Sequence, residues 1–274
     1  MDNLGWDDGK RIRFWGESGK TVIAIHGGPG ASGDMGGLAQ ELSQDFFVIE
    51  PWQRISGDIP VNVSQHIEDL HGLVEKHLAK EKPALIGHSW GAMLALAFAS
   101  AYPETVNAIV LVGCGTFDVE SRTKFKQIIE DRKDPEFDQK IQQISAKFTD
   151  PSERMKEQYN LISNTYDFDL SESDSTDVEK FDFPAHKATW DDMVQLMDSG
   201  VYPQAFDRIS VPVIMLHGSY DPHPGRMTFE TLSKYIPQIE YTEFINCGHS
   251  PWKEKQARNQ FYEKLKSWLR NSNL

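Results

Sequence analysis

Residues 84–91 read ALIGHSWG, and this stretch constrains the fold of the chain more than any other part. An apolar run typical of a buried strand leads into the pattern Gly-x-Ser-x-Gly, and an apolar helical stretch follows at once. This is the context of a nucleophile elbow, a turn so tight that the serine takes strained backbone angles. A Cβ at Gly87 or Gly91 would collide with neighbouring backbone. Five small residues also arise by chance, but the strand and helix around them favour Ser89 as a nucleophile.

Apolar runs without polar alternation recur along the chain, as expected for strands that are covered on both faces. They lie at 21–25, 46–49, 84–86, 108–112, 211–216 and 240–245. Helical patterns lie between and after them, at 63–78, 91–101 and 259–269. This alternation predicts an α/β fold with a mostly parallel central sheet and helices on both faces.

The segment 116–187 breaks the alternation. It is rich in Asp, Glu, Lys, Gln and Ser, has helical patterns around 125–129 and 155–162, and contains no clear buried strand. We interpret it as a helical cap inserted into a core formed by 1–115 and 188–274. Long surface connections are the alternative, but they are unusual at this length. Residues 171–177 are polar and low in complexity, which predicts a mobile loop.

Two later loops supply candidate partners for Ser89. His249 follows the last predicted strand and precedes the last predicted helix, and Asp221 follows the preceding strand. The order Ser, acid, His along the chain is the one found with a nucleophile elbow. Asp221 would accept a hydrogen bond from His249 and stabilise its charged form. The alternatives are a surface or capping role for His249 and an ordinary turn before Pro222 for Asp221.

The glycine-rich segment IHGGPG at 25–30 follows the first predicted apolar strand. Its glycines allow the backbone to approach a ligand closely. We expect the N–H of Gly28 and the N–H of Trp90, at the start of a helix, to hold a developing oxyanion. The alternative is a strand-end turn with no ligand role. Bracing, packing or solvent-facing roles are expected for His26, His217 and His223.

Three motifs together resemble the proline iminopeptidase-related branch of the α/β-hydrolase superfamily: HGGPG at 26–30, GHSWG at 87–91 and GHSPW at 248–252. The resemblance covers the core on both sides of the predicted cap. It implies the α/β-hydrolase fold with a serine nucleophile. It also implies a catalytic triad and an oxyanion hole at Ser89, Asp221, His249, Gly28 and Trp90. It says much less about the substrate.

The chain departs from iminopeptidases in two respects. Where they carry an Asp-Gln-Arg-Gly-type motif after the second core strand, residues 50–57 read EPWQRISG, which keeps Gln53 and Arg54 but loses the following glycine. Their cap also supplies acidic residues that hold the free amine of the substrate. None of the acids here matches that amine site by position. Candidate substrate-binding residues in and near this cap are Glu153, Glu157, Glu172, Tyr159 and Trp190, and further aromatic candidates are Phe148 and Tyr166.

These features predict hydrolysis of an ester or amide through an acyl-enzyme, by an esterase or an aminopeptidase that needs no metal or other cofactor. The expected substrate is a small molecule or a short peptide. Two alternatives stay open. The same fold serves cofactor-free oxygenation, perhydrolysis or carbon–carbon bond cleavage in some relatives, and a non-catalytic ligand-binding protein can keep the same residues.

The composition makes some classes of binding partner and substrate unfavourable. The 274 residues include 28 Lys and Arg against 41 Asp and Glu, a formal net charge of −13. Such a surface disfavours nucleic acid, anionic lipid and strongly anionic substrates, although a local pocket can override the net field. Cys114 and Cys247 lack metal-ligand spacing and are expected to be buried. Without a signal-peptide pattern or an apolar run long enough to span a bilayer, the chain is expected to be cytoplasmic. Its oligomeric state has no sequence signal.

Overall fold

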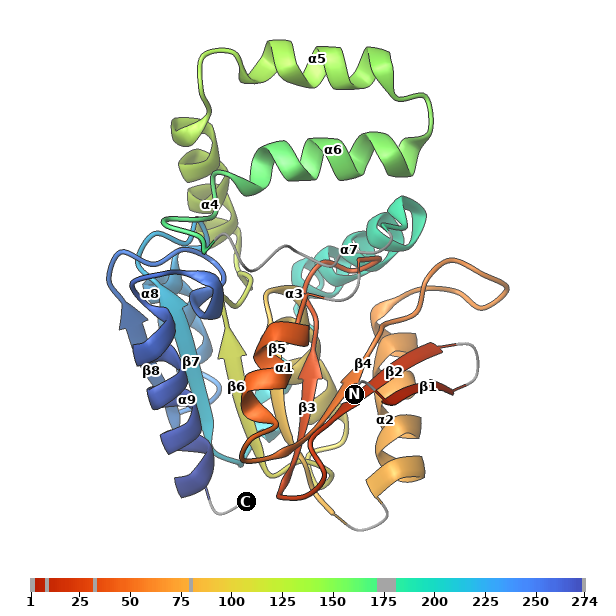
Figure 1. The fold of residues 1–274 in the computed structure, drawn as a ribbon, viewed down its shortest axis with the longest axis vertical. Coiled ribbons are helices and arrows are strands. Elements are labelled where there is room, and N and C mark those ends of the chain that lie inside the picture. The colour runs from red at the N-terminus through yellow and green to blue at the C-terminus, as the bar shows by residue number, and fades with distance from the viewer. Residues whose placement is uncertain (1–2, 8–9, 32–33, 79–80, 172–180, 273–274) are drawn as a thin grey trace.

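The computed structural model describes residues 3–7, 10–31, 34–78, 81–171 and 181–272. Its strands are β1 (Asn3–Asp7), β2 (Lys10–Trp15), β3 (Thr21–Ile25), β4 (Phe47–Pro51), β5 (Ala84–His88), β6 (Ala108–Val112), β7 (Val213–Gly218) and β8 (Ile239–Phe244). They form an eight-stranded sheet in the order β1-β2-β4-β3-β5-β6-β7-β8 (Figure 1). The strands β3 to β8 run parallel, whereas β2 is antiparallel to both β1 and β4. The predicted mostly parallel sheet is confirmed.

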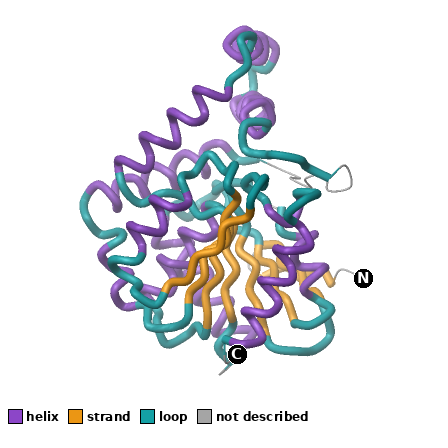
Figure 2. The backbone as a smooth tube through the Cα atoms, turned by 90° about the vertical axis from the view of Figure 1, so that its left-hand side faces the viewer, coloured by secondary structure: helices purple, strands orange, loops and turns teal. Residues whose placement is uncertain are grey.

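Helices cover both faces of this sheet (Figure 2). They are α1 (Gly36–Leu42), α2 (Val63–Leu78), α3 (Trp90–Ala101), α4 (Val119–Arg132), α5 (Phe137–Lys147), α6 (Pro151–Ser163), α7 (Phe183–Asp198), α8 (Gly225–Leu232) and α9 (Arg258–Asn271), with short 3₁₀ turns η1 (Gln204–Arg208) and η2 (Pro251–Lys253). One core contains residues of α2 and α3, and the other contains residues of α1 and α9.

The central strands are apolar throughout because successive side chains enter different cores. Ile23 and Ile25 of β3 pack with α2 and α3, whereas Val22 and Ala24 pack with α1 and α9. All five residues of β3, of β5 and of β6 are buried. A strand without a solvent-facing side has no need of polar alternation, which is why these runs could be recognised in the sequence.

The elements β1, β2, α1, α5, α7 and α8 were not located from the sequence, although the segment that contains α5 was expected to be mostly helical. The strand β2 alternates, since Ile12 joins the apolar core while Arg13 forms a buried ion pair with Glu50 of β4. The Nε of Arg13 donates to Oε2 of Glu50 at 2.9 Å. A search for continuous apolar runs passes over such a strand. Helix α1 begins with Gly36 and Gly37, which are poor helix formers.

Helices α4, α5 and α6 follow β6 and rise above the carboxyl edge of the sheet (Figure 1). The helical patterns around 125–129 and 155–162 lie within α4 and α6. The predicted boundary at 187/188 falls inside α7, which is one continuous helix. This helix contacts both α6 and α2, and it buries Met193 and Met197 in the core. It therefore joins the predicted cap to the predicted core without a break in the backbone. Of the predicted mobile loop at 171–177, the part beyond Ser171 lies outside the described residues.

The composition led to expectations about the two cysteines and about membrane-spanning segments. Cys114 and Cys247 are free thiols and are fully buried, as expected for small apolar side chains. In the part of the chain that the structure describes, the helices are too short or too polar to cross a membrane.

Candidate active site

Ser89 lies in the turn between β5 and α3 with φ of 54° and ψ of −118°. Residues other than glycine rarely adopt these backbone angles, so the strain expected of a nucleophile elbow is present. A Cβ at Gly91 would lie 2.2 Å from the carbonyl oxygen of Ile25, and one at Gly87 would lie 2.2 Å from the carbonyl oxygen of Gly91. Both positions therefore require glycine for the turn to close.

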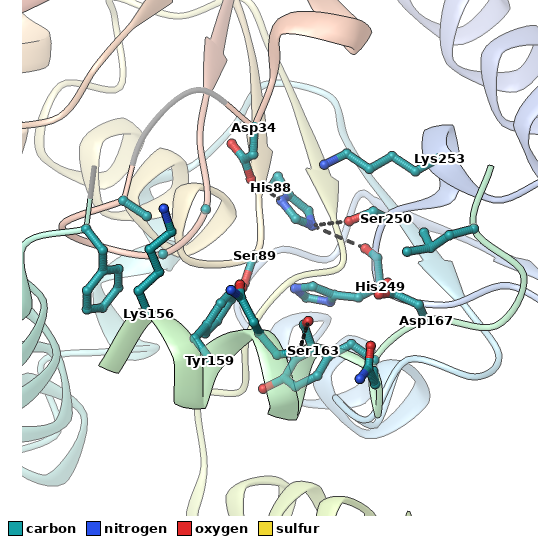
Figure 3. Close-up of a pocket in the computed structure, with 18 of the residues that line it drawn as sticks. Asp34, His88, Ser89, Lys156, Tyr159, Ser163, Asp167, His249, Ser250 and Lys253 are labelled. Carbon is teal, nitrogen blue, oxygen red and sulfur yellow. Dashed lines mark hydrogen bonds and ion pairs between the residues drawn. The ribbon is translucent and has the colours of Figure 1, made fainter. Parts of the chain in front are cut away.

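Ser89 and His249 line one cavity of about 550 Å³ (Figure 3). The glycine-rich loop forms part of its wall, since Gly27 and Gly28 also line it. A Cβ on Gly27 would lie 3.1 Å from the Cβ of Ser89, so this loop passes directly beside the serine. Charged and titratable side chains around the same cavity are Asp34, His88, Lys156, Tyr159, Asp167 and Lys253.

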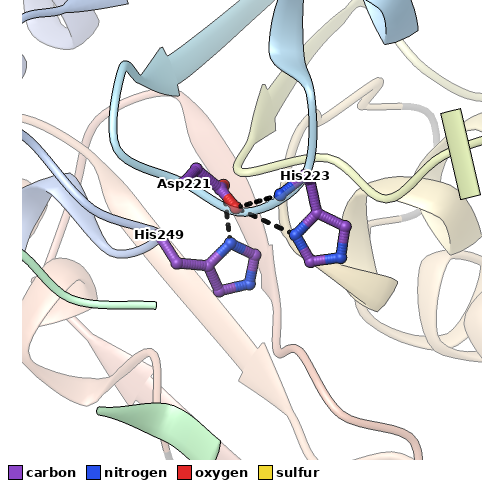
Figure 4. Close-up of side chains that lie close together, drawn as sticks. All are labelled: Asp221, His223 and His249. Carbon is purple, nitrogen blue, oxygen red and sulfur yellow. Dashed lines mark hydrogen bonds and ion pairs between the residues drawn. The ribbon is translucent and has the colours of Figure 1, made fainter. Parts of the chain in front are cut away.

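The predicted acid and base lie in direct contact (Figure 4). Nδ1 of His249 lies 2.7 Å from Oδ2 of Asp221, and both side chains are buried. Because a carboxylate only accepts, the proton of this bond sits on Nδ1, which leaves Nε2 of His249 able to accept another. Burial opposes the charge on Asp221, but the surrounding imidazoles of His249, His217 and His223 hold its pKa well below the ordinary value. The carboxylate is therefore ionised at neutral pH.

His223 contacts both Asp221 and His249, which the sequence analysis did not predict. Its Nδ1 and its backbone N–H both lie 2.9 Å from Oδ1 of Asp221. Its ring stacks on that of His249 with centroids 4.9 Å apart. His217 also touches the acid, with Nε2 at 3.2 Å from Oδ2. The expected packing or solvent-facing role is thus incomplete, because both imidazoles help to orient Asp221.

Among the described residues, Asp221, His223 and His249 also lie close enough together to be considered as metal ligands. Their ligand atoms lie within 4.8 Å of one another. Both imidazoles, however, present Nδ1 to the carboxylate at hydrogen-bond distance. A metal ion would have to displace those two bonds, so hydrogen bonding accounts for the cluster.

Buried Glu254 ties the loop after α6 to the loop that carries His249. Its Oε1 accepts the backbone N–H groups of Phe168 and Gly248, each at 2.9 Å. The N–H of His249 donates to the carbonyl of Tyr166 at 3.0 Å. The Tyr166 ring then meets the imidazole edge-on, with centroids 5.2 Å apart. The chain leaving α6 therefore fixes the backbone on which His249 is mounted.

The retained Gln53 braces the glycine-rich loop that passes beside Ser89. Its backbone N–H donates to Nε2 of His26 at 2.9 Å, and its side-chain amide donates to the carbonyl of His26 at 2.8 Å. Its Oε1 accepts the indole N–H of Trp90 at 2.7 Å. One glutamine thus connects the loop that carries Gly28 to the first residue of α3. The expected bracing role of His26 is confirmed.

The candidate cap residues are spread over different surfaces. Tyr159 lines the cavity, Glu157 lines a separate hollow against α5, and Trp190 packs against the apolar core. Glu153 is exposed in the first turn of α6, and Glu172 lies outside the described residues. The cavity face of α6 consists of Lys156, Tyr159, Asn160 and Ser163. Glu157 instead faces α5, in a hollow that Asn160 and Leu161 also line.

A family model described as alpha/beta hydrolase fold matches residues 20–256. The chain belongs to this family. A proline iminopeptidase of Saccharolobus solfataricus is 23% identical in an alignment that covers 92% of this chain and 85% of that protein. A 2-hydroxy-6-oxononadienedioate/2-hydroxy-6-oxononatrienedioate hydrolase of Paraburkholderia phymatum is 25% identical in an alignment that covers 89% of this chain and 86% of that protein.

A solved structure shares the fold of this α/β hydrolase. It is 2-hydroxy-6-oxo-6-phenylhexa-2,4-dienoate hydrolase from Rhodococcus sp. strain RHA1, with a TM-score of 0.67, 20% identity and 98% of both chains covered. Two other curated relatives match over shorter stretches, which cover 38% and 40% of this chain and 37% of their own length. The predicted family, its relation to proline iminopeptidases and the class of enzyme, a hydrolase, are confirmed.

A second imidazole–carboxylate pair in this α/β hydrolase was missed from the sequence. Nδ1 of His88 lies 3.1 Å from Oδ2 of Asp34, and its Nε2 lies 3.2 Å from the carbonyl of His249. Desolvation opposes the charge of Asp34, but His88, His26 and Lys253 lower its pKa to about 2. His88 occupies a variable place in the Gly-x-Ser-x-Gly pattern, which gave no reason to single it out. Its position beside Ser89 was the available signal.

Proposed function

We propose that this chain is a serine hydrolase that cleaves an ester or amide of a small substrate through an acyl-enzyme. Ser89 is the nucleophile, His249 the general base and Asp221 the acid that orients it. One observation carries the proposal: a strained serine at a strand–helix turn shares a cavity with an imidazole whose far nitrogen is bonded to a buried carboxylate. That arrangement is the one that activates a serine.

The proton path follows from the tautomer. Nε2 of His249 takes the proton of Ser89 as its oxygen attacks the carbonyl carbon, and the C–O or C–N bond of the substrate then breaks. The leaving group receives that proton from His249. Water, deprotonated by the same nitrogen, then attacks the acyl-enzyme. His249 gives that proton to the Ser89 oxygen as the acyl bond breaks, which restores the free serine. Throughout, Asp221 stays ionised and stabilises the imidazolium.

The oxyanion of each tetrahedral intermediate is assigned to the N–H groups of Gly28 and Trp90. Trp90 is the first residue of α3, and the N–H groups of a first helical turn have no partner within the helix. Gly28 lines the cavity with φ of 57°. Each such donor lowers the barrier by roughly 3 kcal/mol when it is aimed at the developing charge.

The helices α4 to α6 serve in this proposal as a cap that limits substrate size, with the start of α7 completing it up to residue 187. The cavity of about 550 Å³ holds a small molecule or the end of a short peptide. An aminopeptidase acting on an N-terminal proline is one specific form of this proposal. It is favoured by the iminopeptidase relatives and not by a particular contact in the cavity.

A fluorophosphonate probe tests the proposal directly. We expect the folded protein to be labelled at one residue, which peptide mass spectrometry should identify as Ser89. The matched control is Ser163→Ala, which removes another serine hydroxyl from the same cavity and should leave labelling intact. A folded protein that resists labelling would favour a non-catalytic ligand-binding protein. Turnover that requires oxygen or peroxide, or that breaks a carbon–carbon bond, would favour the other alternative.

The pH dependence of ester hydrolysis should show a general base whose pKa is lower than that of an ordinary histidine. Burial lowers the pKa of His249 from its ordinary 6.5, against the opposing charge of Asp221 and with the help of His88 and His217. Only the neutral imidazole accepts a proton, so kcat/KM for a neutral ester should rise with pH and reach half its maximum below pH 6.5. A midpoint well above pH 7 in steady-state assays would contradict this assignment.

A further inference from the structure

Two lysines of the cavity have no role in the proposed chemistry. Lys253 ends η2 and is 8% exposed, yet it lines the cavity together with Ser89. Its side chain extends along the wall toward Asp34 and His88 (Figure 3). Lys156 reaches the same cavity from α6, on the cap side. Ammonium groups from the core and from the cap therefore face one space.

Neither ammonium forms an ion pair with a carboxylate among the residues that the structure describes. The Nζ of Lys253 lies 5.7 Å from the ring centroid of Trp252. Lysines on the surface of this acidic chain do find acids, as Lys140 does with Asp134 at 2.8 Å and Lys266 with Glu41 at 2.8 Å. Lys253 is buried, and a buried ammonium is stabilised by a carboxylate at hydrogen-bond distance, which a ligand in this cavity could supply.

The carboxylates of the cavity act on Lys253 only from beyond ion-pair distance. Oδ2 of Asp34 is engaged by His88 at 3.1 Å, and the charge of Lys253 helps to lower the pKa of Asp34. Burial and the charge of Glu254 raise the pKa of Asp167 to about 7, against the pull of Lys253. At neutral pH that carboxyl carries only part of its charge. The cavity is thus richer in positive charge than a chain with a net charge of −13 would suggest.

We propose that the molecule cleaved at Ser89 carries a carboxylate, which Lys253 binds together with Lys156. The proposal rests on the function proposed above, because the charged group must belong to the substrate of Ser89. A substrate with a free amine would instead place a third cation beside these two lysines. The inference therefore separates this cavity from the amine-binding site implied by the resemblance to iminopeptidases.

Three nitrophenyl esters of matched length test the inference. They are 4-nitrophenyl hydrogen adipate, which is anionic, 4-nitrophenyl methyl adipate, which is neutral, and 4-nitrophenyl 6-aminohexanoate, which is cationic. A hydrogen-bonded charge pair that is shielded from water favours the anionic ester over the neutral one by about 10-fold or more in kcat/KM. The preference should shrink as salt is added, because salt screens the attraction.

Lysine-to-methionine variants locate the effect, because methionine keeps most of the apolar stem and removes the charge. We expect Lys253→Met to lower the anionic-to-neutral ratio about 10-fold, and Lys156→Met to lower it less because that ammonium is more exposed. Lys253→Arg should keep most of the preference, since it keeps the charge. The matched control is Lys234→Met, an exposed lysine outside the cavity, which should leave the ratio unchanged.

A wild-type ratio of one or less, or a ratio that neither Lys253→Met nor Lys156→Met changes, would overturn the inference. A preference for the cationic ester would do so too. If Ser89 is labelled by fluorophosphonate but the ratio is one, the anion site fails and the hydrolase stands. Should no ester be hydrolysed, calorimetric binding of the anionic and neutral adipates to Ser89→Ala still tests the lysines. Tighter binding of the anionic probe supports the site, and equal binding overturns it.

Discussion

Replacing Ser89 with alanine is expected to lower kcat for a nitrophenyl ester about 10⁶-fold, the loss seen when a serine nucleophile is removed from a working triad. The hydroxyl is the atom that forms the acyl-enzyme, and neither His249 nor the oxyanion donors can replace it. The substitution removes one oxygen and leaves Gly87 and Gly91 to hold the turn. The midpoint temperature of thermal unfolding should therefore stay within a few degrees of the wild-type value. Steady-state hydrolysis, normalised to folded protein, measures the effect.

The matched comparison for this variant is Ser163→Ala. This serine lines the same cavity, but its hydroxyl donates to the carbonyl of Asn160 in its own helix. We expect this control to lose far less activity than Ser89→Ala. If Ser89→Ala kept more than about one part in a hundred of wild-type activity, the nucleophile would have to be sought elsewhere, given the loss expected from a working triad.

Replacing Asp221 with asparagine is expected to lower kcat about 10⁴-fold at neutral pH. The carboxylate accepts from His249 at 2.7 Å and from His223 at 2.9 Å. An amide nitrogen in place of one oxygen would face a ring nitrogen that is itself a donor. The imidazole of His249 would then be driven to the other tautomer, with its lone pair on the wrong nitrogen. The kcat of the purified variant against a neutral ester is the measurement.

Asp198→Asn is a suitable control for that result. Asp198 forms an ion pair with Arg122 at 2.7 Å, and neither residue lines the cavity of Ser89. It should leave kcat near the wild-type value. A loss below about tenfold in Asp221→Asn would instead move the role of the acid elsewhere, since a triad acid contributes far more. The Asp34–His88 pair is the next candidate, because its carboxylate and imidazole are in contact and both line this cavity.

The elbow could be predicted because its causes are local. Gly87 and Gly91 are required by contacts within the turn and with the adjoining strand end, and the strand and helix on either side follow from uninterrupted apolar runs. The same reasoning failed for β2, where Arg13 alternates with core residues and pairs with Glu50 from another strand. Its polar side chain is explained by a partner that is distant in sequence.

The cap shows the limit of sequence reasoning more clearly. Helical patterns located α4 and α6, but they did not say which side of α6 would face the serine. Glu157 was chosen for its charge, whereas Lys156, one residue earlier, lines the cavity. The orientation of a helix about its axis depends on what it packs against, and that is decided by the assembled molecule.

The sequence by itself determined the strand–turn–helix that strains Ser89, the sheet that supports it and the chain order that singled out Asp221 and His249. These depend on residues a few positions apart or on runs of one chemical kind. Only the tertiary structure decided that His223 shares Asp221 with His249 and that His88 pairs with Asp34. It alone placed the ammonium groups of Lys156 and Lys253 around one cavity. Such contacts join loops from different strands to the cap, and their distances are set by packing that no local pattern encodes.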